Sequence, residues 1–172
     1  MQFTEGLPAF VRLLAGQATT QAQTVAENVD LAMRDPAAYT ARFADDLQER
    51  YSEATDLLED PDKTQTALVH ELAKAGLVAE IDWKEEPEDI VWNVNNVLEQ
   101  QGRTPVDELE ADETEDVPAV LNRLNHALQP RGLTLLELYL NSDSYAVVVA
   151  DASDVLRLHQ LAETLQFRFE QW

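Results

Sequence analysis

The chain has 172 residues, of which 45% are hydrophobic, enough apolar side chain to build a packed core. Its 33 acidic residues against 12 basic ones give a formal net charge of −21 at pH 7. This charge repels phosphate backbones and anionic lipid surfaces, which argues against direct binding of nucleic acids or membranes.

Cysteine is absent, which excludes a disulfide framework and thiolate metal sites and fits a reducing compartment. The apolar patch near the N-terminus has Glu5 before it and Arg12 inside it, which is not the order of a secretory signal. No apolar run approaches the ~20 residues that a membrane-spanning helix needs. We therefore expect a cytoplasmic protein without a signal peptide or a membrane segment.

The first 76 residues predict a part of the chain made of helices alone. Residues 7–34 indicate one or two helices, which the Asp35-Pro36 pair interrupts. From residue 36 to residue 58, apolar positions recur at steps of four and three, which predicts one continuous helix. These positions are Tyr39, Phe43, Leu47, Tyr51, Ala54 and Leu58.

A change of hydrophobic period at Leu77 marks the start of an α+β part, residues 77–172. Before it, a helix capped by Asp60 is expected to run from Pro61 to Gly76. After it, we expect the order β-α-α-β-β-α-β. These elements are a strand at 77–83, a helix from Pro87 to Gly102, a helix from Val117 to Pro130, strands at 133–140 and 145–150, a helix within 151–166 and a strand at 167–172.

The strands at 133–140 and 145–150 are apolar on both faces and flank the turn-forming tetrapeptide NSDS, which predicts a central β-hairpin. The strands at 77–83 and 167–172 alternate apolar and polar residues, as edge strands do. The fold class is therefore predicted as α+β, with a helical N-terminal layer followed by a small mixed or antiparallel sheet of about four strands packed by helices. We interpret residues 1–172 as a single domain, with a helical subdomain docked on the sheet as the alternative.

No catalytic or cofactor motif is present in the sequence. The five glycines are isolated, so none belongs to a phosphate-binding loop, and no serine occupies a nucleophile elbow. His70 and Glu71 begin like the zinc-protease motif, but Lys74 stands where the second histidine belongs. We therefore expect no cofactor and no metal, and we assign the three histidines to helix surfaces or interfaces.

Acidic residues are concentrated in two segments. The stretch DELEADETED, residues 107–116, holds seven carboxylates in ten positions and is expected to be a flexible acidic connector. Along the predicted helix, five carboxylates recur at steps of four, four, three and four, which places them on one face about 5–6 Å apart. This carboxylate row consists of Asp45, Glu49, Glu53, Asp56 and Asp60. Its alternative interpretations are a solvated face, a docking surface for a basic protein and an imitation of the phosphate row of DNA.

A third cluster lies at a strand-to-helix junction, in the segment EIDWKEEPEDIVW at 80–92. It comprises Asp82, Trp83, Lys84, Glu85 and Glu86, and Asp143 of the hairpin turn is expected to lie nearby. In the ordinary interpretation, the carboxylates complement a helix dipole and the tryptophans belong to the core. The functional interpretations are a partner-binding surface, or the site of a small enzyme or metal-binding protein near the first three of these residues and Asp143.

Short motifs connect this part of the chain with a family. They are Asp82-Trp83-Lys84, then Glu88-Asp89-Ile90, and later Ser142-Asp143-Ser144-Tyr145. Through them, residues 77–172 resemble an uncharacterised bacterial family, classed as a domain of unknown function, in which a strand ending in D-W-K precedes a helix and a later hairpin carries S-D-S-Y. The resemblance implies no established activity, and it does not extend to residues 1–76. In charge and size the chain is also similar to immunity proteins that neutralise a cognate toxin.

These patterns favour a non-catalytic acidic interaction protein that binds a basic protein partner, with a toxin-neutralising immunity protein as one form of it. The residues expected to contact the partner are those of the carboxylate row, the cluster Asp82, Trp83, Lys84, Glu85 and Glu86 at the strand-to-helix junction, and Asp143. The alternatives are a small enzyme or metal-binding protein and a DNA-mimic inhibitor.

Overall fold

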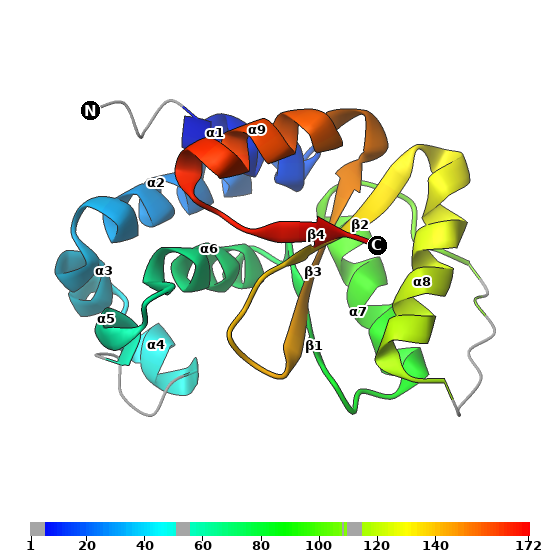
Figure 1. Ribbon diagram of the computed structural model, residues 1–172, viewed down its shortest axis with the longest axis horizontal. Coiled ribbons are helices and arrows are strands. Elements are labelled where there is room, and N and C mark those ends of the chain that lie inside the picture. The colour runs from blue at the N-terminus through cyan, green and yellow to red at the C-terminus, as the bar shows by residue number, and fades with distance from the viewer. Residues whose placement is uncertain (1–5, 51–55, 108, 110–114) are drawn as a thin grey trace.

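The computed structural model describes residues 6–50, 56–107, 109 and 115–172, and helices cover both faces of its antiparallel sheet (Figure 1). The first helices are α1 (Gly6–Ala15), α2 (Thr19–Arg34), α3 (Pro36–Arg42), α4 (Ala44–Arg50), α5 (Asp56–Glu59) and α6 (Lys63–Lys74). The elements that follow are β1 (Ala79–Asp82), α7 (Pro87–Gln100), α8 (Val117–Leu128), β2 (Leu133–Leu138), β3 (Ser144–Asp151), α9 (Val155–Leu165) and β4 (Phe169–Gln171), with 3₁₀ turns at Gln129–Arg131 and Ala152–Asp154. This order confirms the α+β class with its helical N-terminal layer.

The strands of the described sheet are arranged in the order β1-β3-β2-β4, and every neighbouring pair is antiparallel. Leu135 of β2 lies opposite Val149 of β3, while β1 and β4 each pair along one side only. The hairpin therefore occupies the centre and the two alternating strands form the edges, as the sequence predicted. The physical reason is that β2 and β3 carry apolar side chains on both faces and can be covered twice.

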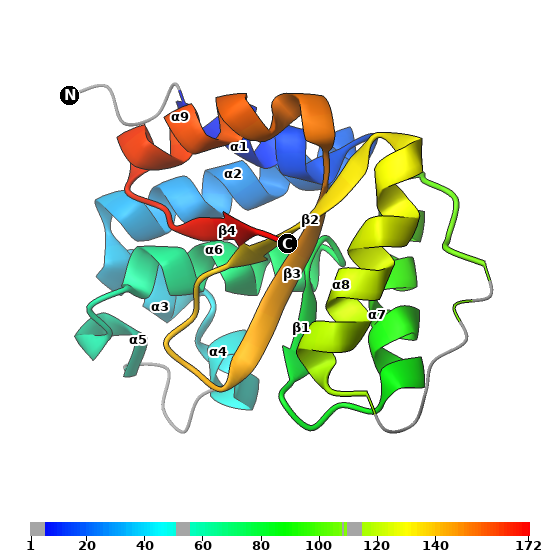
Figure 2. The same cartoon turned by 45° about the vertical axis from the view of Figure 1, so that its right-hand side comes forward.

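Successive side chains of the central strands enter two different cores. Leu136 and Val148 pack with α1, α2, α6 and α9 on one face, whereas Leu135 and Val149 pack with α7 and α8 on the other (Figure 2). The first core thus contains side chains from the N-terminal helices and from the C-terminal part of the chain. The interpretation as a single domain stays a prediction.

The single helix predicted for residues 36–58 is wrong. Phe43 separates α3 from α4, with backbone angles of φ −113° and ψ 25° that are not helical. Tyr39 of α3 and Leu47 of α4 are nevertheless fully buried in the same small core. The apolar period therefore continues across the break, because both helices face that core, and periodicity alone does not reveal it. Residues 51–55 lie outside the described residues.

The expected start of the next helix at Pro61 is also wrong. Helix α6 begins at Lys63, two residues later. The carboxylate of Asp60 accepts hydrogen bonds from the backbone nitrogen of Asp62 at 2.8 Å and from the hydroxyl of Thr66 at 2.6 Å. Asp60 thus closes a turn ahead of the helix, because a short carboxylate readily reaches the backbone two residues on.

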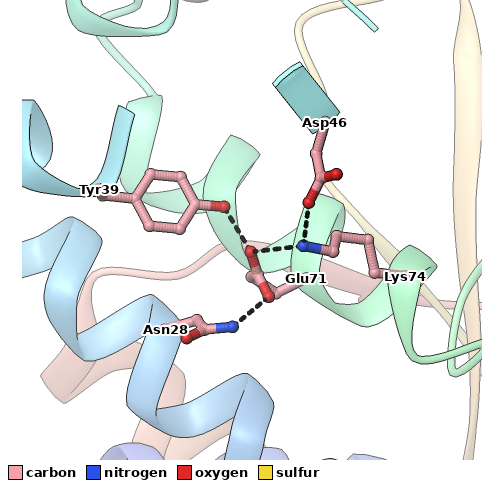
Figure 3. A network of polar contacts seen from close by, with 5 residues as sticks. All are labelled: Asn28, Tyr39, Asp46, Glu71 and Lys74. Carbon is pink, nitrogen blue, oxygen red and sulfur yellow. Dashed lines mark hydrogen bonds and ion pairs between the residues drawn. The ribbon is translucent and has the colours of Figure 1, made fainter. Parts of the chain in front are cut away.

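A buried carboxylate joins the N-terminal helices (Figure 3). Glu71 of α6 is 2% exposed and accepts hydrogen bonds from Nδ2 of Asn28 and Oη of Tyr39, each at 2.7 Å. Lys74 lies 3.9 Å from the same carboxylate and donates to Asp46 of α4. This hydrogen bond, together with the charge of Lys74, holds the pKa of Asp46 below its usual value. One polar network therefore connects α2, α3, α4 and α6.

Candidate functional site

The structure brings the end of β1 and the hairpin turn together, as expected. Asp82 lies opposite Ser144 in the sheet, so Asp143 is one residue away from the register partner of Asp82. Asp82 and Asp143 are both exposed. The junction cluster and the hairpin turn therefore share one end of the sheet.

Hydrogen bonds within the junction hold its shape. The carboxylate of Asp82 accepts from the backbone nitrogen of Lys84 at 2.9 Å, and its carbonyl oxygen accepts from that of Glu85 at 3.0 Å. The carboxylate of Glu85 accepts in return from the backbone nitrogen of Asp82 at 3.2 Å. Two of the expected partner-binding carboxylates thus also stabilise the turn that carries Trp83.

The tryptophans of this region lie on the surface, so their assignment to the core is wrong. Trp83 is 54% exposed and Trp92 of α7 is 64% exposed. Helix α7 buries the stripe that begins at Ile90 and continues through Val94, and Trp92 lies off this stripe. The ammonium nitrogen of Lys84 lies 4.4 Å from the centre of the Trp83 ring, so this indole already holds a cation.

We call this surface the acidic aromatic face and define it by the junction and the first turns of α7. Its residues are Asp82, Trp83, Lys84, Glu85, Glu86, Glu88, Asp89 and Trp92. Glu88 and Asp89 occupy the first turn of α7, where the helix dipole stabilises negative charge. Tryptophan is one of the residue types that contribute most to the energy of protein interfaces. The arrangement is therefore suited to binding a cationic surface.

The enzyme or metal-binding alternative was placed at the same end of the sheet. Among the described residues, no group of three or more His, Cys, Asp or Glu side chains could hold a metal ion. Of the three histidines assigned to helix surfaces or interfaces, His70 of α6 is buried, with 4% exposure. His126 and His159 are exposed, as expected.

The structure does not place the carboxylate row on one helix. Asp45 and Glu49 belong to α4, Asp56 belongs to α5, and Asp60 follows α5 in the turn described above. Helix α4 ends at Arg50 and α5 ends at Glu59, so Asp60 lies beyond the end of the second helix. Outside the described residues lie Glu53 and, in the expected connector, residues 108 and 110–114. Contact of the row with a partner stays a prediction.

A second group of ionisable side chains, which the sequence did not single out, surrounds β4. A cleft of about 620 Å³ lies beside this strand and is lined by residues of β2, β4 and α9. Glu137 of β2 lies directly opposite Glu170 of β4. Partial burial, and then the charge of Glu170, raise the pKa of Glu137.

Replacing Glu137 by glutamine is expected to raise the free energy of unfolding at pH 7. Because its pKa is raised, Glu137 binds a proton more tightly in the folded protein than in the unfolded chain, so its ionisation opposes folding once the pH exceeds the ordinary pKa of a glutamate. Glutamine removes this opposition, and the gain should be present at pH 7 and vanish at about pH 4. Urea denaturation of wild type and variant at both pH values measures it. An equal gain in unfolding free energy at both pH values would contradict a raised pKa of Glu137.

Within the described ranges, no helix combines the length and the apolar character needed to cross a membrane.

Comparison with known proteins identifies a family. No curated protein and no solved structure matches the chain significantly. A family model described as a domain of unknown function, DUF6630, matches residues 7–172. The resemblance inferred for residues 77–172 alone was too narrow, because the match includes the N-terminal helices. The chain belongs to the DUF6630 family, which confirms its assignment to an uncharacterised domain family.

Proposed function

We propose that this protein is a non-catalytic interaction protein whose acidic aromatic face binds a basic protein partner. The observation that carries the proposal is the exposure of Trp83 and Trp92, 54% and 64%, within a short segment that also carries five carboxylates. Carboxylates bind arginine and lysine through charge-assisted hydrogen bonds, and the face of an indole binds the same cations. Both kinds of side chain therefore select the same ligand, a cationic side chain of the partner.

The position of Lys84 supports this proposal. Its ammonium group lies 4.4 Å from the centre of the Trp83 ring, where an arginine of the partner would bind after displacing it. Arginine suits this place better than lysine, because its planar guanidinium stacks on the ring while it donates to carboxylates. The net charge of −21 adds long-range attraction, so association should be fast and sensitive to salt.

A partner that acts on nucleic acid would meet these requirements, because such proteins present clustered arginine and lysine side chains. On this ground we propose an immunity-type role, the neutralisation of a basic toxin in the cytoplasm, as the more specific form of the function. Its support is the charge and size of the chain together with the acidic aromatic face.

The double substitution Trp83→Ala and Trp92→Ala tests the proposal without changing the net charge. The probe is a peptide of about 12 residues that alternates arginine and serine, titrated by calorimetry at about 0.05 M salt. We expect the affinity to fall about tenfold, because two cation–π contacts of about 0.5–1 kcal/mol are lost.

Leu156→Ala is the matched control, since it removes a side chain that is 72% exposed on α9 and should leave the affinity unchanged. Equal affinity of the tryptophan variant and the wild type would mean that charge alone attracts the peptide, and the proposal would then fail.

A further inference from the structure

Among the described residues, no strand pairs with the outer edge of β4, so this edge is open to another strand. The backbone nitrogen of Tyr139 donates to the carbonyl oxygen of Arg168 at 3.0 Å, so the backbone of Arg168 faces β2. Glu170 lies two residues later, opposite Glu137, and its backbone faces β2 as well. Residues that bond to the neighbouring strand alternate along an antiparallel strand, so the backbone groups of Phe169 and Gln171 point away from β2. An edge of this kind offers N–H and C=O groups to an incoming strand.

A cleft beside this edge provides the room. The cleft has a volume of about 620 Å³, and its lining includes His159 and Glu163 of α9 and Phe169 and Glu170 of β4. The rings of His159 and Phe169 are stacked with their centres 4.3 Å apart. In both views α9 runs beside β4 (Figures 1 and 2). An edge strand with an adjacent groove is the arrangement that binds extended peptides by strand addition.

The charges of the cleft favour a basic segment. Glu137, Glu163 and Glu170 line it, and none of them forms an ion pair with another described residue. Arg168 also lines the cleft, but its guanidinium pairs with Asp62 at 2.6 Å and lies 4.0 Å from the centre of a tyrosine ring. The carboxylates therefore remain available to lysine or arginine side chains of a ligand.

We propose that β4 binds an extended, basic segment of a partner protein, which pairs with Phe169 and Gln171 as an additional strand. This surface is separate from the acidic aromatic face, and the inference does not rest on that face. A second copy of this chain fits less well. Antiparallel pairing of β4 with itself would bring the Glu170 side chains of the two copies close together, and like charges across strands are destabilising.

The test compares Gln171→Pro with Gln171→Ala. Both variants lose the 3.1 Å hydrogen bond from the side-chain amide of Gln171 to the hydroxyl of Thr134. Only proline also removes the outward N–H that an added strand needs, and proline is tolerated on the free side of an edge strand. The probe is the tightest peptide selected against wild type from a displayed library of random peptides of about 12 residues, long enough to span the edge.

We expect the selected peptide to carry net positive charge and to bind about tenfold more weakly to Gln171→Pro than to Gln171→Ala, because one backbone hydrogen bond is lost. The double substitution Glu163→Lys and Glu170→Lys changes exposed positions only, and it should weaken the same peptide by at least about tenfold at low salt. This charge variant decides the question if thermal melting shows that Gln171→Pro does not fold.

Three results would overturn the inference. The selected peptide could be acidic, or it could bind the proline and lysine variants as tightly as the alanine variant. Hydrogen exchange could instead show that the amides of Phe169 and Gln171 become protected with rising protein concentration and no peptide, which would make a second copy the occupant.

Discussion

Replacing Glu71 by alanine is expected to lower the free energy of unfolding by about 3 kcal/mol. The substitution removes the acceptor that lies 2.7 Å from both Nδ2 of Asn28 and Oη of Tyr39. Asn28 is 7% exposed and Tyr39 is 0% exposed, so water does not readily replace the lost carboxylate. The removed side chain also leaves a cavity among α2, α3 and α6. Urea denaturation at pH 7, followed by circular dichroism, measures the loss.

Two variants serve as controls for Glu71. Glu71→Gln keeps the volume and one acceptor oxygen, so the expected loss is about 1 kcal/mol. Glu99→Ala truncates an exposed glutamate of α7 and should change stability by no more than about 0.5 kcal/mol. If Glu71→Ala were no more destabilising than Glu99→Ala, the network would not stabilise the N-terminal helices.

Replacing Gln101 by alanine is expected to cost about 2 kcal/mol of unfolding free energy. Gln101 is fully buried, and its side-chain amide donates to the carbonyl oxygens of Leu14 and Val149, both at 2.7 Å. It thereby joins the end of α1 to β3. The contact with β3 is at Val149, two residues beyond Val147, which is the last residue of β3 that pairs with β1. Alanine deprives two buried carbonyl groups of this donor and leaves a cavity.

The neighbouring Gln100 is exposed and gives a matched control, because Gln100→Ala removes the same side chain from the surface. Its expected effect is within about 0.5 kcal/mol. Thermal and urea unfolding of both variants should separate them clearly, and equal stabilities would contradict a bridging role for Gln101.

The sheet could be predicted from the sequence because its pattern has a direct physical cause. β3 is apolar at successive positions from Ala146 to Ala150, and only a strand covered on both faces tolerates this. The alternation around Ile81 likewise identified an edge strand. Helix boundaries were harder, since the two helices that meet at Phe43 direct their apolar side chains into one core. A hydrophobic period records which side is buried and not whether the axis is continuous.

The candidate site could be predicted only in part. Its location followed from element order, because Asp82 ends a strand that pairs beside the hairpin turn. The exposure of Trp83 and Trp92 could not be predicted from the sequence, since large apolar residues are buried on average and a single sequence gives no reason for an exception. Glu71 and Gln101 were missed for the opposite reason. Charged and amide side chains are expected on the surface, and only the packed structure provides the partners that allow their burial.

Three indole N–H signals can report directly on whether the acidic aromatic face binds cations. The chain has three tryptophans, of which Trp83 and Trp92 are exposed, whereas Nε1 of Trp172 is buried. Nitrogen-15-labelled protein is titrated with the arginine-serine peptide while these signals are followed by NMR. We predict that the signals of Trp83 and Trp92 shift progressively with added peptide and that the signal of Trp172 stays in place. Peptide binding that leaves the Trp83 and Trp92 signals unchanged would contradict the proposed function.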